Sequence, residues 1–298
     1  MKYQRLGKSN LNISRIGFGC MSLKRGEFQN ENILHHAVEW GINYFDTADL
    51  YDKGDNEGLL GRALKSKRNE IVLATKVGNQ WRSDGSGWDW NPRKEYILKC
   101  VEESLKRLQT DHIDLYQLHG GTMEDPIDET IEAFEQLVKE GKIRYYGISS
   151  IRPNVIRYWA ENSNMVSVMT QYSLLDRRPE EESLSLLQQK NIGVLVRGSV
   201  AQGLLVDKSA KPYLNYSEEQ VSNAAKAIHA VSDNTRSAAQ TAIQFVLNHP
   251  SVTSAIVGIR TMAQLEEAVR VLDVNTMSDQ ELIQLQNSLP ANRYQDHR

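Results

Sequence analysis

Short apolar runs alternate with longer stretches of helical spacing along the whole chain, and this alternation limits the folds that the chain can adopt. The apolar runs are predicted strands, and they lie at residues 15–20, 43–46, 70–76, 113–118, 144–148, 168–171, 192–197 and 254–259. Runs that are apolar throughout are typical of parallel strands covered on both faces. About eight such strands, alternating with predicted helices, favour an α/β fold, a closed (β/α)8 TIM barrel. An open, doubly wound sheet is the structural alternative.

Further patterns add detail to this barrel. Residues 3–14 indicate an N-terminal β-hairpin, and extra helices and loops are expected at the C-terminal face. Asp125 and Pro126 before a helical segment, with Gly141 after it, are typical helix boundaries. A second helix is predicted from the spacing of Ile97, Val101, Leu105 and Leu108. No Pro/Gly/Ser-rich linker and no strict repeat interrupts the chain, so we expect a single domain over residues 1–298.

Charge and composition exclude several classes of partner. The formal net charge is −3 and no block of lysines and arginines occurs, so neither nucleic acid nor a membrane is an expected partner. Apolar runs such as residues 192–196 are far shorter than the roughly 20 residues of a membrane-spanning helix. The first residues contain no apolar stretch of signal-peptide length, so we expect a cytoplasmic protein. Cys20 and Cys100 are expected to be reduced thiols, and no metal site is predicted.

Four polar side chains stand at or just after the ends of predicted strands, where buried polar groups are unusual. They are Asp46, Tyr51, Lys76 and His119. The carboxyl ends of the strands surround the active site of a (β/α)8 barrel, so these side chains can converge at one mouth. A strand-end histidine or a loop tyrosine is often only structural, whereas a lysine within an apolar run is rarer. Together, the four residues predict a catalytic site.

These residue types suit the protonation of a carbonyl oxygen. A phenol has a reference pKa of about 10, so Tyr51 needs help to donate a proton near neutrality. A cation about 4 Å away contributes roughly 4 kcal/mol at an effective dielectric near 20, and Lys76 is expected to lower the pKa of Tyr51 in this way. Asp46 would keep Lys76 charged, and His119 would donate to the substrate oxygen. None of them is a hydride source, so a reduced nicotinamide is the natural second reactant.

Several separated segments resemble the aldo-keto reductase family, in the order in which that family has them. Residues 41–51 (GINYFDTADLY) and 56–61 (NEGLLG) look like its first signature, residues 73–77 (LATKV) its lysine strand, and residues 111–119 (DHIDLYQLH) its histidine strand. The resemblance implies a barrel enzyme that reduces an aldehyde or ketone to the alcohol, reversibly, with a nicotinamide cofactor. Tyr51 is then the general acid, Lys76 and Asp46 its tuning pair, and His119 the donor that orients the carbonyl. The implied partner is a small carbonyl compound. The chain is expected to be a monomer, with an oligomer left open.

The resemblance also implies a set of cofactor-binding residues. Ser149 and Gln171 match carboxamide ligands of the family, while Ser150 stands where an asparagine is usual. Residues 197–205 align with a pyrophosphate loop that begins here with Arg197. Arg260 suits a ribose 2′-phosphate, because a guanidinium binds phosphate through two hydrogen bonds, so NADPH is favoured over NADH. The full set is Gly19, Cys20, Met21, Asp46, Ser149, Ser150, Gln171, Arg197, Gly198, Ser199, Gln202, Gly203, Gly258, Arg260, Gln264 and Glu267.

Other readings of the sequence stay open. Trp81, Trp88 and Trp90 follow the lysine strand and are expected either to wall the substrate pocket, as a lid, or to pack on a neighbouring helix. Residues 17–22 contain only part of a GxGxxG motif, which leaves a Rossmann fingerprint unsupported. A nucleotide-sensing regulatory subunit with little turnover is the alternative function. A metal-dependent hydrolase is a third candidate, although residues 15–20 lack the histidine pair that such barrels often carry.

Overall fold

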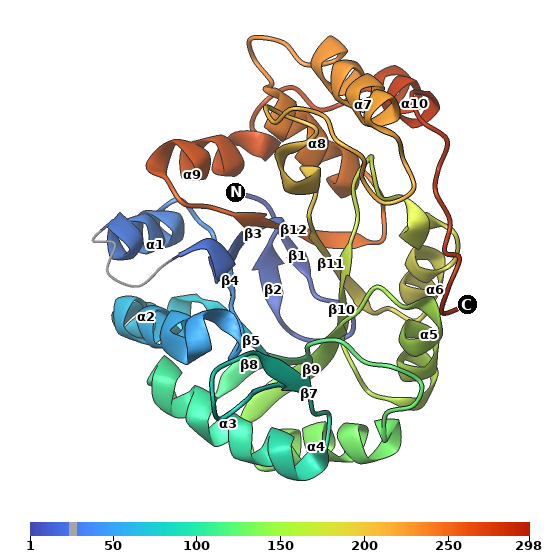
Figure 1. Ribbon diagram of the computed structural model, residues 1–298. Helices are drawn as coiled ribbons and strands as arrows, with labels where there is room; N and C mark the ends of the chain where they lie inside the picture. Colours follow the sequence, from blue (N-terminus) through green and yellow to red (C-terminus); the bar gives the residue numbers. More distant parts are fainter. Residues whose placement is uncertain (24–28) are drawn as a thin grey trace.

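Eight parallel strands form a closed barrel at the centre of the molecule (Figure 1). The computed structural model describes residues 1–23 and 29–298. Around the barrel the order of neighbouring strands is β3, β4, β5, β8, β9, β10, β11 and β12, and β12 pairs with β3 to close the ring. These strands are β3 (Ile16–Gly19), β4 (Tyr44–Asp46), β5 (Val72–Val77), β8 (Ile113–Leu118), β9 (Ile143–Ser149), β10 (Ser167–Gln171), β11 (Gly193–Arg197) and β12 (Val252–Gly258). The predicted (β/α)8 barrel is confirmed, and the open-sheet alternative is wrong.

Helices surround the barrel on its outer side (Figure 1). They are α1 (Gln29–Glu39), α2 (Asp55–Ala63), α3 (Lys94–Leu108), α4 (Ile127–Lys139), α5 (Pro153–Asn162), α6 (Ser183–Gln189), α7 (Glu218–Ala230), α8 (Ala238–Leu247), α9 (Met262–Val269) and α10 (Asp279–Asn287). Short 3-10 turns add η1 (Cys20–Ser22), η2 (Tyr51–Gly54), η3 (Lys65–Glu70), η4 (Arg178–Glu180), η5 (Ala201–Gly203) and η6 (Arg270–Leu272). In the described part of the chain, every helix is too short or too polar to cross a membrane.

Two antiparallel hairpins accompany the barrel. The N-terminal pair, β1 (Tyr3–Arg5) and β2 (Asn12–Ser14), is the hairpin predicted from residues 3–14. The second pair, β6 (Asn79–Trp81) and β7 (Trp88–Trp90), follows β5 and is not among the predicted strands. The first hairpin lies at the amino ends of the barrel strands, where Leu6 at its turn is fully buried. The second follows the carboxyl end of β5, so the two hairpins occupy opposite ends of the barrel.

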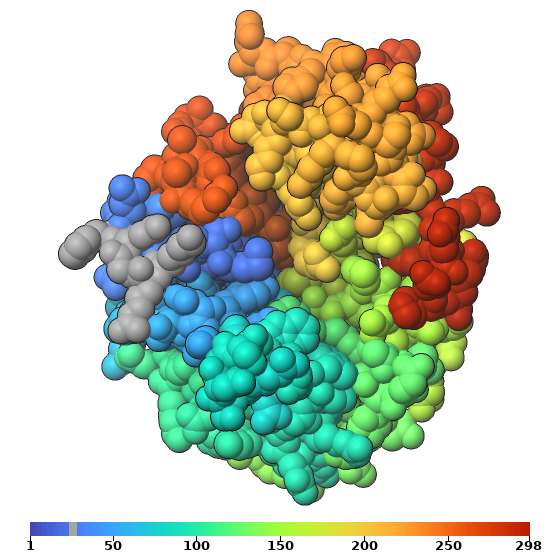
Figure 2. All heavy atoms as spheres, viewed as in Figure 1, coloured from blue at the N-terminus to red at the C-terminus, as the bar shows by residue number. Residues whose placement is uncertain are grey.

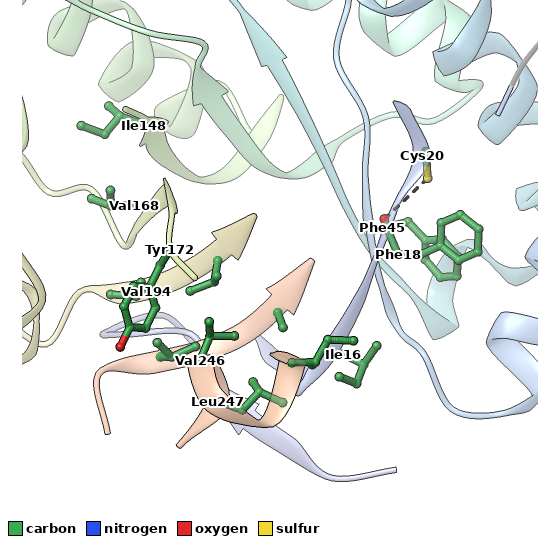
Figure 3. Close-up of a cluster of buried hydrophobic side chains, with 14 of the residues drawn as sticks. Ile16, Phe18, Cys20, Phe45, Ile148, Val168, Tyr172, Val194, Val246 and Leu247 are labelled. Atoms are coloured by element: carbon green, nitrogen blue, oxygen red, sulfur yellow. Dashed lines mark hydrogen bonds between the residues drawn. The ribbon is translucent and has the colours of Figure 1, made fainter. Parts of the chain in front are cut away.

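The buried apolar side chains form two clusters, one on each face of the barrel wall. The larger cluster fills the space between strands and helices, and Figure 3 shows part of it, with Phe18 and Phe45 stacked at a ring-centroid distance of 5.7 Å. The smaller cluster fills the barrel interior with Leu6, Leu11, Ile13, Tyr44, Val72, Ala74, Leu115, Val166, Met169, Leu195 and Ile256. Alternate residues of a strand point to opposite faces. The interior cluster therefore identifies which residues of β4, β5, β8, β10, β11 and β12 face inward.

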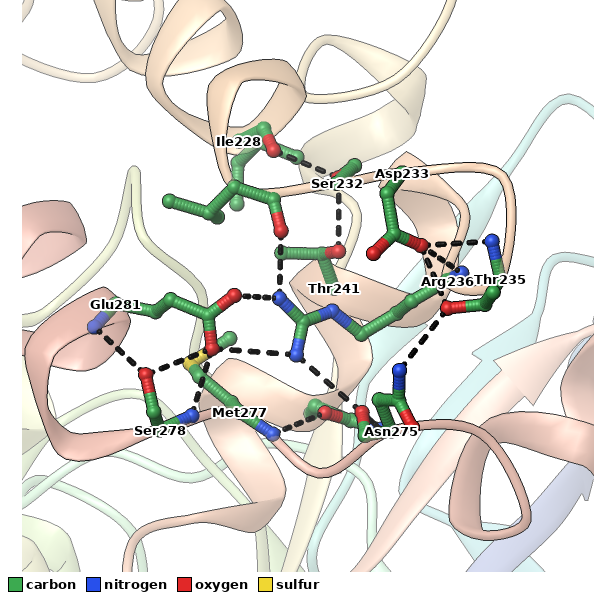
Figure 4. Close-up of polar contacts among 12 residues, drawn as sticks. Ile228, Ser232, Asp233, Thr235, Arg236, Thr241, Asn275, Met277, Ser278 and Glu281 are labelled. Atoms are coloured by element: carbon green, nitrogen blue, oxygen red, sulfur yellow. Dashed lines mark hydrogen bonds and ion pairs between the residues drawn. The ribbon is translucent and has the colours of Figure 1, made fainter.

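An ion pair between a buried arginine and a partly exposed glutamate links the outer helices α7, α8 and α10 (Figure 4). Arg236, just before α8, is only 3% exposed. It donates to the Val231 carbonyl after α7 and to the Glu281 carboxylate in α10. Burial opposes ionisation of Glu281, but Arg236 and Ser278 outweigh it, and the pKa of Glu281 is lowered. The pair lies among the outer helices, away from the strand ends that carry the predicted site.

Candidate active site

The inward-facing register of the strands brings three of the four predicted catalytic residues to one end of the barrel. Asp46 continues the inward series of Tyr44 in β4, and Lys76 continues that of Val72 and Ala74 in β5. His119 follows Leu115 by four positions at the end of β8. Tyr51 lies in η2, the turn that follows β4. All four side chains therefore reach the C-terminal mouth, as predicted.

Lys76 is the centre of this group. Its side chain is 1% exposed, and its ammonium has three N–H donors. They meet the Asp46 carboxylate at 2.6 Å, the Thr47 carbonyl at 2.7 Å and the Tyr51 hydroxyl at 3.4 Å. Gln117 adds a donor to the other oxygen of Asp46 at 3.3 Å. The ammonium is thus held in one orientation, with one of its N–H groups directed at the phenol.

Within the buried Asp46–Lys76 pair, the lysine is stabilised in its charged form. Burial lowers the pKa of Lys76, but Asp46 and Tyr51 outweigh this effect, so the net shift is upward. Burial also raises the pKa of Asp46, while Lys76, Gln117 and Arg197 oppose that rise. A charged lysine that loses its carboxylate partner in such a site would be strongly disfavoured. Asp46 therefore keeps a permanent cation beside Tyr51.

His119 is a neutral imidazole. Burial, together with the nearby cations Lys76 and Arg197, lowers its pKa to about 3. Its Nδ1 atom is buried and has no hydrogen-bond partner among the described residues. The ring meets Tyr51 edge-on at a centroid distance of 5.8 Å. A neutral ring with a buried Nδ1 leaves Nε2 as the nitrogen that can hydrogen-bond to a ligand in the mouth.

The backbone next to Tyr51 is held in an unusual conformation. Asp52 has φ 49°, Lys53 φ 55° and Gly54 φ 90°, so three successive residues lie in the left-handed region. Non-glycine residues rarely adopt this conformation, and it often occurs at functional sites. A Cβ at Gly54 would lie 2.7 Å from Nε of Arg107, so a larger residue there would displace the Arg107 side chain. This tight turn fixes the position from which Tyr51 enters the mouth.

A buried acidic group behind Lys76 was not anticipated from the sequence. Glu57 is fully buried, and its carboxylate accepts from Thr75 at 2.6 Å and from Arg107 at 2.6 Å. Asp49 is 9% exposed, and its Oδ1 has no hydrogen-bond partner in the described part of the chain. Burial, and then the charge of Glu57, raise the pKa of Asp49 to about 8. Both acids lie within the two parts of the first signature, residues 41–51 and 56–61, but no pattern in these segments indicates that they are buried together.

On the other side of the mouth, Gln171 and Arg197 form a hydrogen-bonded pair. They are partners in the register of β10 and β11, and Nη1 of Arg197 donates to Oε1 of Gln171 at 3.0 Å. The amide nitrogen of Gln171 donates to Asp176 at 2.8 Å and to the Tyr213 hydroxyl at 3.0 Å. Its two N–H groups are thereby used, and only one lone pair of Oε1 stays available. Tyr213 and Asp176 were not predicted, because both act from outside the strands.

Ser149 and Ser150 lie at the end of β9, beside this pair in the barrel order. Ser149 is 8% exposed and Ser150 is 5% exposed. The hydroxyl of Ser150 accepts from the backbone N–H of Arg152 at 3.2 Å. Both residues are thus largely buried at the carboxyl end of β9, the end that carries the other predicted site residues.

The segment after β11 also has a strained backbone. Gly198 has φ 76°, and Ala201, Gln202 and Gly203 follow with φ 46°, 60° and 93°. Ser199 in this segment is 3% exposed, whereas Gln202 is exposed. Consecutive left-handed residues turn the chain sharply at the rim, where backbone N–H groups can face a phosphate. Within this loop the N–H groups of Ala201 and Gly203 donate to the carbonyls of Gly198 and Val200, at 2.8 and 2.9 Å.

The segments after β3 and β12 are adjacent, because these two strands pair. Gly19 faces Gly258 in their register, and Arg260 is exposed just before the N-cap Thr261 of α9. Cys20 is fully buried, backbone included, and its carbonyl already accepts from Asn56 at 2.9 Å, whereas Met21 is 66% exposed. Two predicted ligands already have protein partners. Gln264 accepts from the Arg260 backbone at 2.9 Å, and Glu267 accepts from the Ser237 hydroxyl at 2.6 Å.

The three predicted pocket tryptophans lie on the β6–β7 hairpin. Trp81 has the ammonium of Lys53 over its ring at 5.1 Å, which ties the hairpin to the turn that carries Tyr51. Trp88 is 48% exposed. Trp90 donates from its indole to Asp125 at 2.9 Å, and a Cβ at Gly78 would lie 2.6 Å from its ring. Trp90 thus packs onto the barrel, while Trp81 and Trp88 lie further along the hairpin.

The mouth is a hollow between these segments. Figure 2 shows it between the teal residues of the β6–β7 hairpin and the yellow-orange residues that follow β11. Within residues 1–23 and 29–298, no three His, Cys, Asp or Glu side chains are grouped as metal ligands. The groups that do converge are a proton-bearing phenol, a fixed ammonium and a neutral imidazole. This set can protonate an oxygen on which negative charge develops.

Comparison with known proteins gives a consistent result. The sequence model described as the aldo/keto reductase family matches residues 15–289. An uncharacterized oxidoreductase, YqkF of Bacillus subtilis, is 48% identical over 307 aligned positions, which cover 100% of each chain. The aldo-keto reductase AKR11C1 from Bacillus halodurans, solved in its holo form, superposes with a TM-score of 0.94 at 47% identity, covering 100% of this chain and 99% of that one. The aldo-keto reductase yakc [NADP(+)] of Schizosaccharomyces pombe is 35% identical over 68% of this chain and 63% of its own length.

Proposed function

The chain belongs to the aldo/keto reductase family, and we propose that it reduces an aldehyde or ketone to the alcohol with NADPH, reversibly, at the mouth formed by Asp46, Tyr51, Lys76 and His119. One observation carries this proposal. The Lys76 ammonium lies 2.6 Å from Asp46 and 3.4 Å from the Tyr51 hydroxyl. The contact with Asp46 would hold a buried lysine without a phenol nearby. A phenol that donates its proton near neutrality, by contrast, requires a neighbouring cation such as Lys76.

Each of the four residues has a separate role in the protonation of the substrate oxygen. Neutral His119 donates a hydrogen bond that orients the carbonyl and polarises it. Tyr51 gives its proton to the oxygen as an alkoxide forms there. The Lys76 ammonium, 3.4 Å away, stabilises the phenolate that is left. Asp46 keeps that ammonium charged and in place. A bound reduced nicotinamide supplies the hydride.

Several features of the mouth fit a dinucleotide. The exposed guanidinium of Arg260 stands at the N-terminus of α9, where backbone N–H groups and the helix dipole favour a phosphate. The loop after β11 turns sharply at the rim, and those of its backbone N–H groups that do not already donate within the loop can face a pyrophosphate. Ser149 and the free lone pair of Gln171 suit a carboxamide. The NADP(+) in the name of the yeast relative agrees with this choice of cofactor.

Replacement of the phenol tests the proposal directly. In Tyr51→Phe we expect kcat to fall by about 10²–10⁴, because one general acid is lost. Binding of NADPH, followed by its fluorescence, should stay within about twofold of wild type, since only the hydroxyl is removed. A panel of aldehydes and ketones serves as substrate. Wild-type turnover in the variant would refute the role of Tyr51. Tight NADPH binding by the wild type without oxidation by any carbonyl would favour the nucleotide-sensing alternative instead.

The preference for NADPH is tested at Arg260. A phosphate that loses a charge-assisted partner loses about 1.5–3 kcal/mol, so Arg260→Ala should weaken NADPH binding by roughly ten- to a hundredfold. Binding of NADH, which lacks the 2′-phosphate, should hardly change. Titration of both cofactors against both proteins measures this. Equal affinities of the wild type for NADPH and NADH would contradict the assignment.

A further inference from the structure

The turn that carries Tyr51 is strained, so neighbouring elements must hold it in place. Asp52 and Lys53 both lie in the left-handed region, although neither is a glycine. Residues in this conformation persist only where the surrounding structure fixes them. Within the turn, the backbone N–H of Lys53 donates to the Leu50 carbonyl at 3.4 Å, which is a long hydrogen bond. The position of the Tyr51 phenol therefore depends on contacts that reach the turn from outside.

Arg107, in the last turn of α3, makes such a contact. Its side chain occupies the space into which a side chain at Gly54 would project, since a Cβ there would lie 2.7 Å from Nε, 2.8 Å from Cδ and 3.1 Å from Cζ. Gly54 has φ 90° and is the N-cap at which the turn enters α2. Because Gly54 has no side chain, the arginine packs on the backbone of the turn itself. This contact lies three residues after Tyr51.

The same guanidinium is linked to the strand that carries Lys76. Nε of Arg107 donates to Oε2 of the fully buried Glu57 at 2.6 Å, and Oε1 of Glu57 accepts from the Thr75 hydroxyl at 2.6 Å. Thr75 directly precedes Lys76 in β5 and is also fully buried. Arg107 thus contacts the turn of Tyr51 directly and the strand of Lys76 through one carboxylate.

Arg107 is held in its charged form between the outer helices α2 and α3 (Figure 1). Burial lowers its pKa, but the charge and the hydrogen bond of Glu57 outweigh burial, with Asp49 and Cys100 adding to the net rise. Loss of the cation alone would leave the buried Glu57 carboxylate without its ion-pair partner, which is strongly disfavoured. The ion pair therefore holds the first turn of α2, where the Tyr51 turn ends, against α3 and β5.

We propose that Arg107 is a positioning residue, which sets the distance between the Tyr51 hydroxyl and the Lys76 ammonium by holding the turn and the strand that carry them. The inference rests on the proposed function and extends it to a residue outside the mouth. The distance, 3.4 Å, matters because the ammonium stabilises the phenolate that remains after proton transfer. A misplacement of about 1 Å at a reacting group can lower a rate by about a hundredfold.

A double-mutant cycle on kcat tests this role. Arg107→Ala is combined with Glu57→Gln, so that no unpaired charge stays buried, and the combined change is made in wild type and in Tyr51→Phe. In wild type it should lower kcat about ten- to a hundredfold, with the KM of the carbonyl substrate and the affinity for NADPH nearly unchanged. In Tyr51→Phe it should lower the residual kcat less than about twofold, because no hydroxyl is left to misplace.

Two further variants complete the cycle. Arg107→Lys keeps the positive charge and an aliphatic stem over Gly54, so it should retain most of the wild-type kcat. If the combined variant does not fold, Arg107→Gln with Glu57→Gln is a smaller truncation and replaces it in both backgrounds.

Arg68→Ala is the matched control. Arg68 also donates to a buried carboxylate, that of Asp114 at 2.8 Å, but at the amino end of β8, away from the mouth. Asp114 keeps a second cation, Arg144 at 3.2 Å, so the control is expected to fold. Its melting temperature should fall while its kcat stays at the wild-type value.

Two results would overturn the inference and leave the proposed function intact. The first is a wild-type kcat in the combined Arg107 and Glu57 variant. The second is an equal fold-loss of kcat in the wild-type and Tyr51→Phe backgrounds, which would mean that Arg107 does not act through the phenol. A wild type that oxidises NADPH with no carbonyl compound would instead overturn the proposed function.

Discussion

At the scale of single residues, the position of the site follows from the alternation of side chains along a strand, in which every second residue points to the same face. Tyr44, Val72 and Leu115 face the barrel interior, and the side chains two or four positions later are Asp46, Lys76 and His119. Polar groups that continue an inward series past the apolar layer must emerge at the mouth. The same register places Gln171 and Arg197 there, after Met169 and Leu195. The roles assigned to these residues remain proposals, but their convergence is a property of the fold.

Asp49 leads to a prediction on pH. Its pKa in the folded protein is about 8, far above the usual 3.8, chiefly because it is buried. The proton that it retains stabilises the fold fully below pH 3.8, and this contribution is lost as the pH rises toward 8. Asparagine has the same shape and never ionises. Asp49→Asn should therefore gain stability over wild type between pH 5 and 9, reaching on the order of 2–3 kcal/mol.

Urea unfolding at pH 5.5 and pH 8.5 measures this difference. The matched control is Asp207→Asn, since Asp207 is an exposed carboxylate. The unfolding free energy of this control, relative to wild type, should be the same at both pH values. An Asp49→Asn gain that is equal at both pH values would mean that Asp49 does not hold a proton in the folded state.

At the scale of elements, the strands were predictable and the turns between them were not. All eight barrel strands begin and end within two residues of the apolar runs, because a strand covered on both faces must be apolar throughout. Left-handed residues such as Lys53 and Gln202 have no sequence signature of the kind that glycine provides, so the turns at Tyr51 and after β11 could not be foreseen. The contacts of Gln171 with Asp176 and Tyr213 depend on how those segments fold back over the rim.

Helix α8 offers a prediction at this scale. Its N-cap Ser237 forms a capping box with Gln240 and also donates to Glu267 of α9 at 2.6 Å. Ser217 caps α7 with the same box at an exposed position. Ser217→Ala should cost about 0.5–1 kcal/mol, the usual value of an N-cap. Ser237→Ala should cost roughly 1 kcal/mol more, since it also leaves the Glu267 carboxylate without this donor. Chemical denaturation of both variants gives the comparison, and equal losses would show that the link to α9 contributes nothing.

At the scale of the whole molecule, the two ends of the barrel have separate tasks. The C-terminal end gathers the polar groups of the mouth. The N-terminal end is closed by the β1–β2 hairpin, whose Leu6, Leu11 and Ile13 complete the interior cluster. A Cβ at Gly193 would lie 2.5 Å from Leu6, so this hairpin fits tightly against the barrel floor. Barrels of this kind commonly place stability at one end and chemistry at the other.

Leu6→Ala tests this separation. The fully buried side chain leaves a cavity when it is truncated, and such truncations cost about 2–5 kcal/mol. We expect the melting temperature to fall by several degrees, while the affinity for NADPH and the kcat at 25 °C stay close to those of wild type, because the mouth lies at the far end of a rigid, closed sheet. Tyr51→Phe should show the reverse pattern, with turnover lost and the melting temperature nearly unchanged. A Leu6→Ala protein that melts lower and also loses NADPH affinity in its folded temperature range would mean that the hairpin helps to shape the mouth through the interior cluster.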